Sequence, residues 1–201
     1  MSLDRAMLRR ESYDTAQQFL IASDPSLARF PRPTKALAFY WGLNVVELPR
    51  SVAHLDHGMI IGHRIIVARE RRFWERQLTI AHELGHFALK AFNDQQEEEC
   101  SAFGSALLVP FEDLDDSLRF FLGSGPYSIG ALAWSEAENG VVSRLVHHYA
   151  VGYKALIWAI GDYGLLQGVP EWHGGDAIDS LMAEYRGAWE QARNRFQTSA
   201  D

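Results

Sequence analysis

Between Arg72 and Phe92 the apolar residues recur every three or four positions, and the stretch contains no proline. This spacing places them on one side of a helix, since an α-helix turns once every 3.6 residues. The residues on this side are Trp74, Leu78, Ala81, Gly85, Leu89 and Phe92. The pattern predicts a long helix over residues 72–92 with one buried face.

The segment before this helix has the pattern of β-structure. Two short apolar runs, Met59–Ile61 and Ile65–Val67, flank Gly62-His63-Arg64, which predicts a β-hairpin. A third strand is expected at Asn44–Leu48, which contains adjacent β-branched residues. A small sheet followed by helices indicates an α+β fold, with a small antiparallel or mixed β-sheet packed on a helical bundle.

Further helices are expected on both sides of this core. Residues 2–21 and 34–41 precede the sheet with a partly apolar helical spacing. After the long helix, helices are predicted over residues 95–109, from residue 112 onward, and over 129–137, 141–150, 153–160 and 178–197. Because Gly174-Gly175 separates the last helix, we expect a domain of residues 1–170 and a C-terminal helical extension of 171–201 packed on the same domain.

Composition and charge narrow the classes of partner. The chain has 201 residues, of which 47% are hydrophobic and 22% charged, an ordinary globular composition. Its net charge of −7 disfavours nucleic acid as a direct partner, because phosphate binding needs clustered positive charge. The single cysteine, Cys100, cannot form an internal disulfide, and the charged N-terminus has no apolar core of a signal peptide. The apolar stretch 155–160 is too short to span a bilayer, so we expect a cytoplasmic protein without membrane contact.

One motif carries candidate chemistry: His82-Glu83-Leu84-Gly85-His86, in the middle of the predicted long helix. Residues four apart lie one turn above each other, so both imidazoles can reach one metal ion with Glu83 beside it. Such a set suits Zn²⁺ with an open position for water, whose pKa falls toward about 7 so that the glutamate can take its proton. The alternative is an amphipathic helix with two hydrogen-bonded histidines and a solvated glutamate. The position directly after a hairpin favours the metal site.

A catalytic site of this type needs a third protein ligand, and the next predicted helix offers Glu97, Glu98 and Glu99. On a helical projection Glu99 shares the apolar face with Phe103 and Leu107, whereas its two neighbours lie with small or polar residues. A carboxylate on a buried face is costly unless a cation pairs with it, so Glu99 is the expected third ligand. The alternative is an acidic first turn that the helix dipole stabilises.

Two blocks of this sequence resemble the ImmA/IrrE family of bacterial metallopeptidases. One comprises residues 76–86 and ends in the His-Glu-Leu-Gly-His motif; the other comprises residues 99–110, in which Cys100 and Gly104 replace the family's usual alanines. The similarity covers roughly residues 36–166 and implies a zincin-like fold and a cytoplasmic zinc endopeptidase. The site residues that it implies are His82, His86 and Glu99 as zinc ligands and Glu83 as the general base.

The resemblance also implies a protein substrate, a helix-turn-helix transcriptional repressor in a phage, mobile-element or stress-response circuit. The residues alone support only metal-assisted hydrolysis, and two alternatives stay open. The chain could be a catalytically silent zincin-fold protein that regulates a partner by binding, or a zinc hydrolase of small molecules or short peptides. No sequence feature specifies an oligomeric state or a role for residues 167–201.

Two further features concern how a substrate would be held. A zinc peptidase often uses a histidine or tyrosine to stabilise the oxyanion, and the candidates are His147, His148, Tyr149 and Tyr153. An exposed strand edge within residues 59–68 would bind an extended peptide by main-chain pairing.

Overall fold

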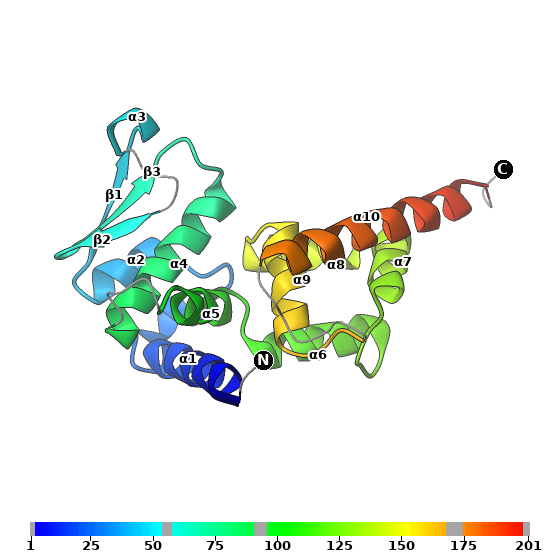
Figure 1. The fold of residues 1–201 in the computed structure, drawn as a ribbon, viewed down its shortest axis with the longest axis horizontal. Coiled ribbons are helices and arrows are strands. Elements are labelled where there is room, and N and C mark those ends of the chain that lie inside the picture. The colour runs from blue at the N-terminus through cyan, green and yellow to red at the C-terminus, as the bar shows by residue number, and fades with distance from the viewer. Residues whose placement is uncertain (1–2, 54–57, 91–95, 168–174, 199–201) are drawn as a thin grey trace. The chain divides into compact units, whose positions relative to one another are not determined.

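The computed structural model describes residues 3–53, 58–90, 96–167 and 175–198, and its helices and strands are labelled in Figure 1. The chain folds into two compact units, each packed mostly within itself. The first comprises residues 2–110 and 149–151, and the second comprises residues 111–148 and 152–201. The division expected from the sequence, into residues 1–170 and 171–201, stays a prediction of domain organisation.

The first unit contains a mixed sheet of β1 (Asn44–Leu48), β2 (Met59–Ile61) and β3 (Arg64–Ala68). β3 is the middle strand, with β1 parallel and β2 antiparallel to it. β2 and β3 form the predicted hairpin, and Gly62 in its turn has a φ of +56°, which glycine adopts without strain. The α+β fold with a small mixed sheet is therefore confirmed.

The predicted long helix is α4 (Phe73–Leu89), which lies next to the sheet (Figure 1). Its start is supported by Glu75, whose carboxylate accepts a hydrogen bond of 3.0 Å from the backbone N–H of Arg72. It ends three residues earlier than predicted, because Lys90 takes a left-handed conformation with a φ of +53°. The capped start and the left-handed end fix the span over which α4 presents its side chains.

The next helix, α5 (Glu97–Leu108), crosses α4 at very short range. A Cβ built on Gly85 of α4 would lie 2.9 Å from the carbonyl oxygen of Cys100. A Cβ built on Gly104 of α5 would lie 3.0 Å from the backbone nitrogen of His82. The two glycines thus let the helices meet backbone to backbone, which brings the start of α5 close to the His-Glu-Leu-Gly-His motif.

Another side of α5 packs on α1 (Leu3–Ile21). Phe103 of α5 is fully buried, and its ring stands edge-on to that of Phe19 with 5.6 Å between the centroids. The small residues of α5 therefore face α4, while a large aromatic residue faces α1. The remaining elements of this unit are η1 (Pro25–Ala28), α2 (Thr34–Tyr40) and α3 (Arg50–Ala53).

The second unit is built from helices that follow one another closely along the chain. They are α6 (Phe111–Leu122), α7 (Ile129–Asn139), α8 (Val141–Tyr149), α9 (Tyr153–Asp162) and α10 (Gly175–Thr198). α10 packs along α7 and also contacts α9, where Lys154 pairs with Asp179 at 2.6 Å. The helices predicted from residue 112 onward are thus present. Within the described ranges, no helix combines the length and the apolar character needed to cross a membrane.

Candidate metal centre

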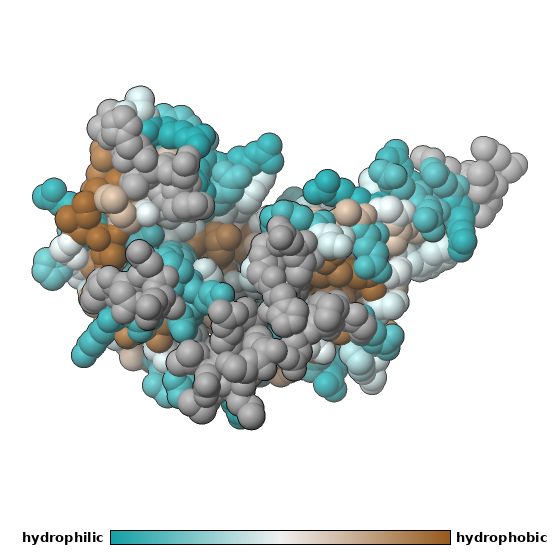
Figure 2. Space-filling model, in the orientation of Figure 1, coloured by the Kyte–Doolittle hydropathy of each residue, from teal (hydrophilic) through white to brown (hydrophobic). Residues whose placement is uncertain are grey.

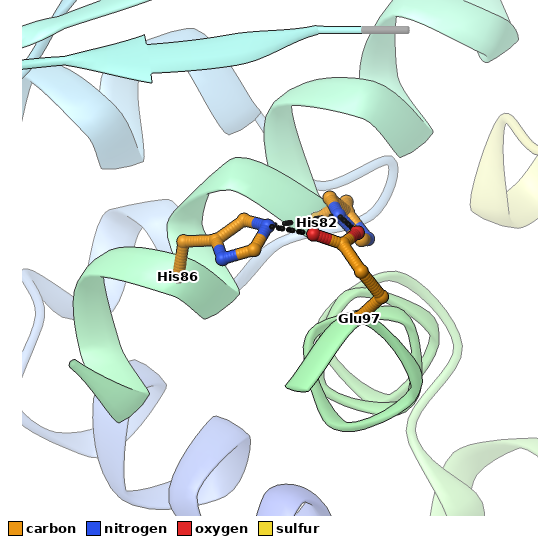
Figure 3. Close-up of side chains that lie close together, drawn as sticks. All are labelled: His82, His86 and Glu97. Carbon is orange, nitrogen blue, oxygen red and sulfur yellow. Dashed lines mark hydrogen bonds and ion pairs between the residues drawn. The ribbon is translucent and has the colours of Figure 1, made fainter. Parts of the chain in front are cut away.

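His82 and His86 lie one turn apart on α4, and Glu97 in the first turn of α5 points toward them (Figure 3). The Nε2 atoms of the two histidines are 3.1 Å apart. The Glu97 carboxylate completes the group, with Oε2 at 3.0 Å from Nε2 of His82 and Oε1 at 3.3 Å from Nε2 of His86. These three side chains form the one cluster of possible metal ligands found in the part of the chain that the structure describes, with ligand atoms within 4.8 Å of one another.

The chemistry of this cluster fits a divalent metal ion. Two imidazole nitrogens and a carboxylate oxygen face the same small space, and each can ligate a cation through a lone pair. Two histidines and one glutamate are also a ligand set that leaves a coordination position open for water or substrate. The side chain of Glu97 is 52% exposed, so this side of the cluster is accessible from solvent.

The structure brings Glu97 to the histidines, whereas the sequence pattern predicted Glu99. α5 meets α4 through small residues, Cys100 and Gly104, and Glu97 continues that face by one turn toward the N-terminus. Glu99 lies on the side of the helix that carries Phe103, and its Oε2 is buried without a hydrogen-bond partner among the described residues. Glu99 was predicted because it shares a face of α5 with a large apolar residue, Phe103. In the structure this residue packs on α1.

Glu83, the expected general base, lies next to the cluster and is buried, with 4% of its surface exposed. Burial raises the pKa of its carboxyl to about 7; His86 opposes this shift, and the Glu97 carboxylate adds to it. Gly58, just before β2, packs against the same carboxylate, since a Cβ built there would lie 3.1 Å from Oε1 of Glu83. It would also overlap Cγ2 of Thr79, so a side chain at position 58 has no room.

The second ring nitrogen of each histidine is close to a side chain of α5. Oγ of Ser101 lies 3.2 Å from Nδ1 of His82. Sγ of Cys100 lies 3.4 Å from Nδ1 of His86, and burial raises the pKa of this thiol to about 12. Neither contact was predicted from the sequence. They could have been predicted from the spacing, because Cys100 and Ser101 follow Glu97 by three and four residues and therefore lie on the same face of the helix.

Each of the four candidates for stabilising an oxyanion contacts another residue of its own compact unit. The pairs are Tyr149 with the ring of Phe30, His147 with the carbonyl of Ser143, His148 with the carboxylate of Asp113, and Tyr153 with the hydroxyl of Ser143. A catalytic role for any of the four stays a prediction.

The fold and the cluster together define a class of protein, in which a helix next to a small sheet carries two histidines and a flanking glutamate, as in metallopeptidases. Residues 42–122 match the family model described as the IrrE N-terminal-like domain of Peptidase M78. This range runs from just before β1 to the end of α6 and includes His82, His86 and Glu97. This part of the chain is therefore similar to the ImmA/IrrE family of metallopeptidases, which confirms the resemblance found in the sequence. No curated protein matches the chain.

Proposed function

We propose that this protein is a zinc-dependent endopeptidase. The observation that carries the proposal is the convergence of His82, His86 and Glu97, with the carboxyl of Glu83 buried beside them. The first three residues would hold the ion. Zinc bound there would lower the pKa of a water molecule toward about 7 and polarise the carbonyl of the peptide bond.

Glu83 acts as the general base and then as the general acid. Its carboxylate takes one proton from the water whose oxygen attacks the carbonyl carbon. The same proton passes to the nitrogen of the leaving amine as the C–N bond breaks, and the second proton of the water stays on the new carboxyl group, so the products are a carboxylic acid and an amine. Glu83 is suited to this role because it lies next to His82 on α4 yet is not one of the three side chains that form the cluster.

The substrate lies along β2 as an added strand. Among the described strands, β2 pairs only with β3. The N–H and C=O groups on its other edge can therefore form hydrogen bonds with a peptide. Gly58, just before β2, packs against Glu83, so a peptide paired with this strand would run toward the general base. Ile61 is 56% exposed, and Figure 2 shows apolar side chains gathered at the surface over the sheet. A largely apolar, extended segment is therefore the expected substrate.

The proposed substrate is a helix-turn-helix transcriptional repressor in a phage, mobile-element or stress-response circuit. This proposal rests on the similarity of residues 42–122 to the ImmA/IrrE family, and the peptidase class by itself implies a protein substrate. A repressor carries a basic DNA-binding surface, and the net charge of −7 on this chain favours its approach.

The test uses the purified protein and repressors encoded near its gene. We expect zinc-loaded protein to cut one of them at a defined site, as seen by mass spectrometry of the fragments. Treatment with 1,10-phenanthroline should reduce cleavage to background, and added zinc should restore it. A matched incubation with an unrelated folded protein should give no fragments.

Two results would contradict the proposal. Cleavage that persists after chelation would mean that the metal is not needed for it. Binding of a repressor without cleavage by the zinc-loaded protein would favour the catalytically silent regulator instead.

A further inference from the structure

We propose that Ser101 and Cys100 are positioning residues that fix the two histidines for metal binding, an inference that rests on the proposed metal site. Each histidine ring has two nitrogens with different neighbours. Both Nε2 atoms face the Glu97 carboxylate, at 3.0 and 3.3 Å. Both Nδ1 atoms face α5, where Oγ of Ser101 lies at 3.2 Å and Sγ of Cys100 at 3.4 Å.

Metal ligation through Nε2 requires one tautomer of each ring, and the neighbours on α5 can stabilise it. A neutral imidazole carries its proton on one nitrogen and a lone pair on the other. With a metal ion ligated by both Nε2 atoms, each ring must carry its proton on Nδ1, where the Ser101 hydroxyl oxygen accepts it from His82 and the Cys100 sulfur accepts it from His86. The lone pairs at Nε2 are then directed at the space beside Glu97, as metal ligation requires.

One helix therefore supplies the third ligand and both supports. Glu97, Cys100 and Ser101 are related as i, i+3 and i+4, so they share the face of α5 that meets α4. Their approach to the histidines depends on the backbone contact at Gly85, which leaves no room for a Cβ. The site is thus assembled when α5 packs on α4, and metal affinity depends on this packing.

The two supports differ in strength and in exposure. A hydroxyl oxygen is a better hydrogen-bond acceptor than a thiol sulfur, so Ser101 contributes more than Cys100. Ser101 is exposed, and its Oγ can be removed without leaving a cavity in the core. Cys100 is fully buried, and its removal changes core packing as well. Ser101 is therefore the residue on which the inference is tested.

The test compares Ser101→Ala, Ser101→Thr and Ser105→Ala with the wild type in the full chain. Ser105 lies one turn farther along α5 and serves as the matched control. Competition with a chromophoric chelator gives the zinc dissociation constant, and ¹H–¹⁵N spectra of the imidazoles report the tautomers. We expect Ser101→Ala to weaken zinc binding about 10- to 100-fold and to lose the protected Nδ1–H signal of His82. Ser101→Thr keeps the hydroxyl and should stay within about threefold of the wild type, as should Ser105→Ala.

The outcomes separate this inference from the proposed function. Equal zinc affinity and unchanged His82 signals in the wild type and in Ser101→Ala would overturn the positioning role while leaving the metal site intact. A wild-type chain that binds no zinc would overturn both. Cys100→Ala provides a second variant, for which we expect a smaller loss of affinity and a change confined to the His86 signals. An equal loss of zinc affinity in Ser105→Ala and Ser101→Ala would also contradict the proposal. The loss would then come from a less stable α5 and not from the contact between Ser101 and His82.

Discussion

Replacing Glu83 with glutamine should lower peptide hydrolysis by about 10²- to 10⁴-fold, the usual contribution of a general base, and leave zinc bound. Glutamine has the size of glutamate, so the buried position next to His82 stays filled. Its amide cannot accept and return a proton, and it was never one of the three clustered ligands. Initial rates of repressor cleavage and the zinc content of the same samples measure the two parts of this prediction.

The matched control is Glu98→Gln, which makes the same chemical change on an exposed position of α5. This variant should cleave at the wild-type rate. Hydrolysis by Glu83→Gln at the rate of the control would remove Glu83 from the proposed mechanism. Loss of zinc from Glu83→Gln would instead mean that this side chain helps to hold the ion.

Replacing Gly85 with alanine should separate α4 from α5 and disturb the metal site. The new Cβ would lie 2.9 Å from the carbonyl oxygen of Cys100 and 3.0 Å from its Cα, so backbone has to move. Overpacking of this kind typically costs about 1–3 kcal/mol of unfolding free energy, against which the higher helix propensity of alanine returns about 1 kcal/mol. Since Glu97 is carried by the displaced helix, zinc affinity should fall more than stability does.

Gly187→Ala is the control for this substitution. Gly187 lies within α10, and a Cβ built on it would meet no atom within 4 Å, so alanine there should raise stability by about 0.5–1 kcal/mol. Urea unfolding and zinc competition on both variants provide the comparison. Wild-type zinc affinity in Gly85→Ala would contradict the close contact between the two helices.

Local sequence patterns predicted much of the fold, because the elements that position the site have strong periodicity. The hairpin at residues 59–68 and α4 were both predicted, and so was the motif that holds His82 and His86. The parallel pairing of β1 with β3 was not, since strand pairing depends on contacts between segments rather than on either segment alone. The end of α4 was not predicted either, because the left-handed residue there is Lys90 and not the glycine that usually marks such an end.

The candidate third ligand shows why the buried face of a helix cannot be assigned from the pattern of that helix alone. Apolar size placed Glu99 on a buried side of α5, and the structure agrees that this side is partly buried. The side that meets α4 is instead marked by small residues, which permit the closest approach. α5 packs on α1 as well as on α4. Glu97 can be predicted as the ligand only when both contacts are known, and no local sequence pattern contains that information.

The central claim is that His82, His86 and Glu97 hold a metal ion, and metal content tests it most directly. Elemental analysis would be made on the wild type, Glu97→Ala and Glu99→Ala, purified side by side without chelators. The structure predicts about one zinc per chain in the wild type and in Glu99→Ala, and little or none in Glu97→Ala. Zinc kept by Glu97→Ala and lost from Glu99→Ala would contradict this ligand set, and no zinc in any of the three after reconstitution would contradict the metal site itself.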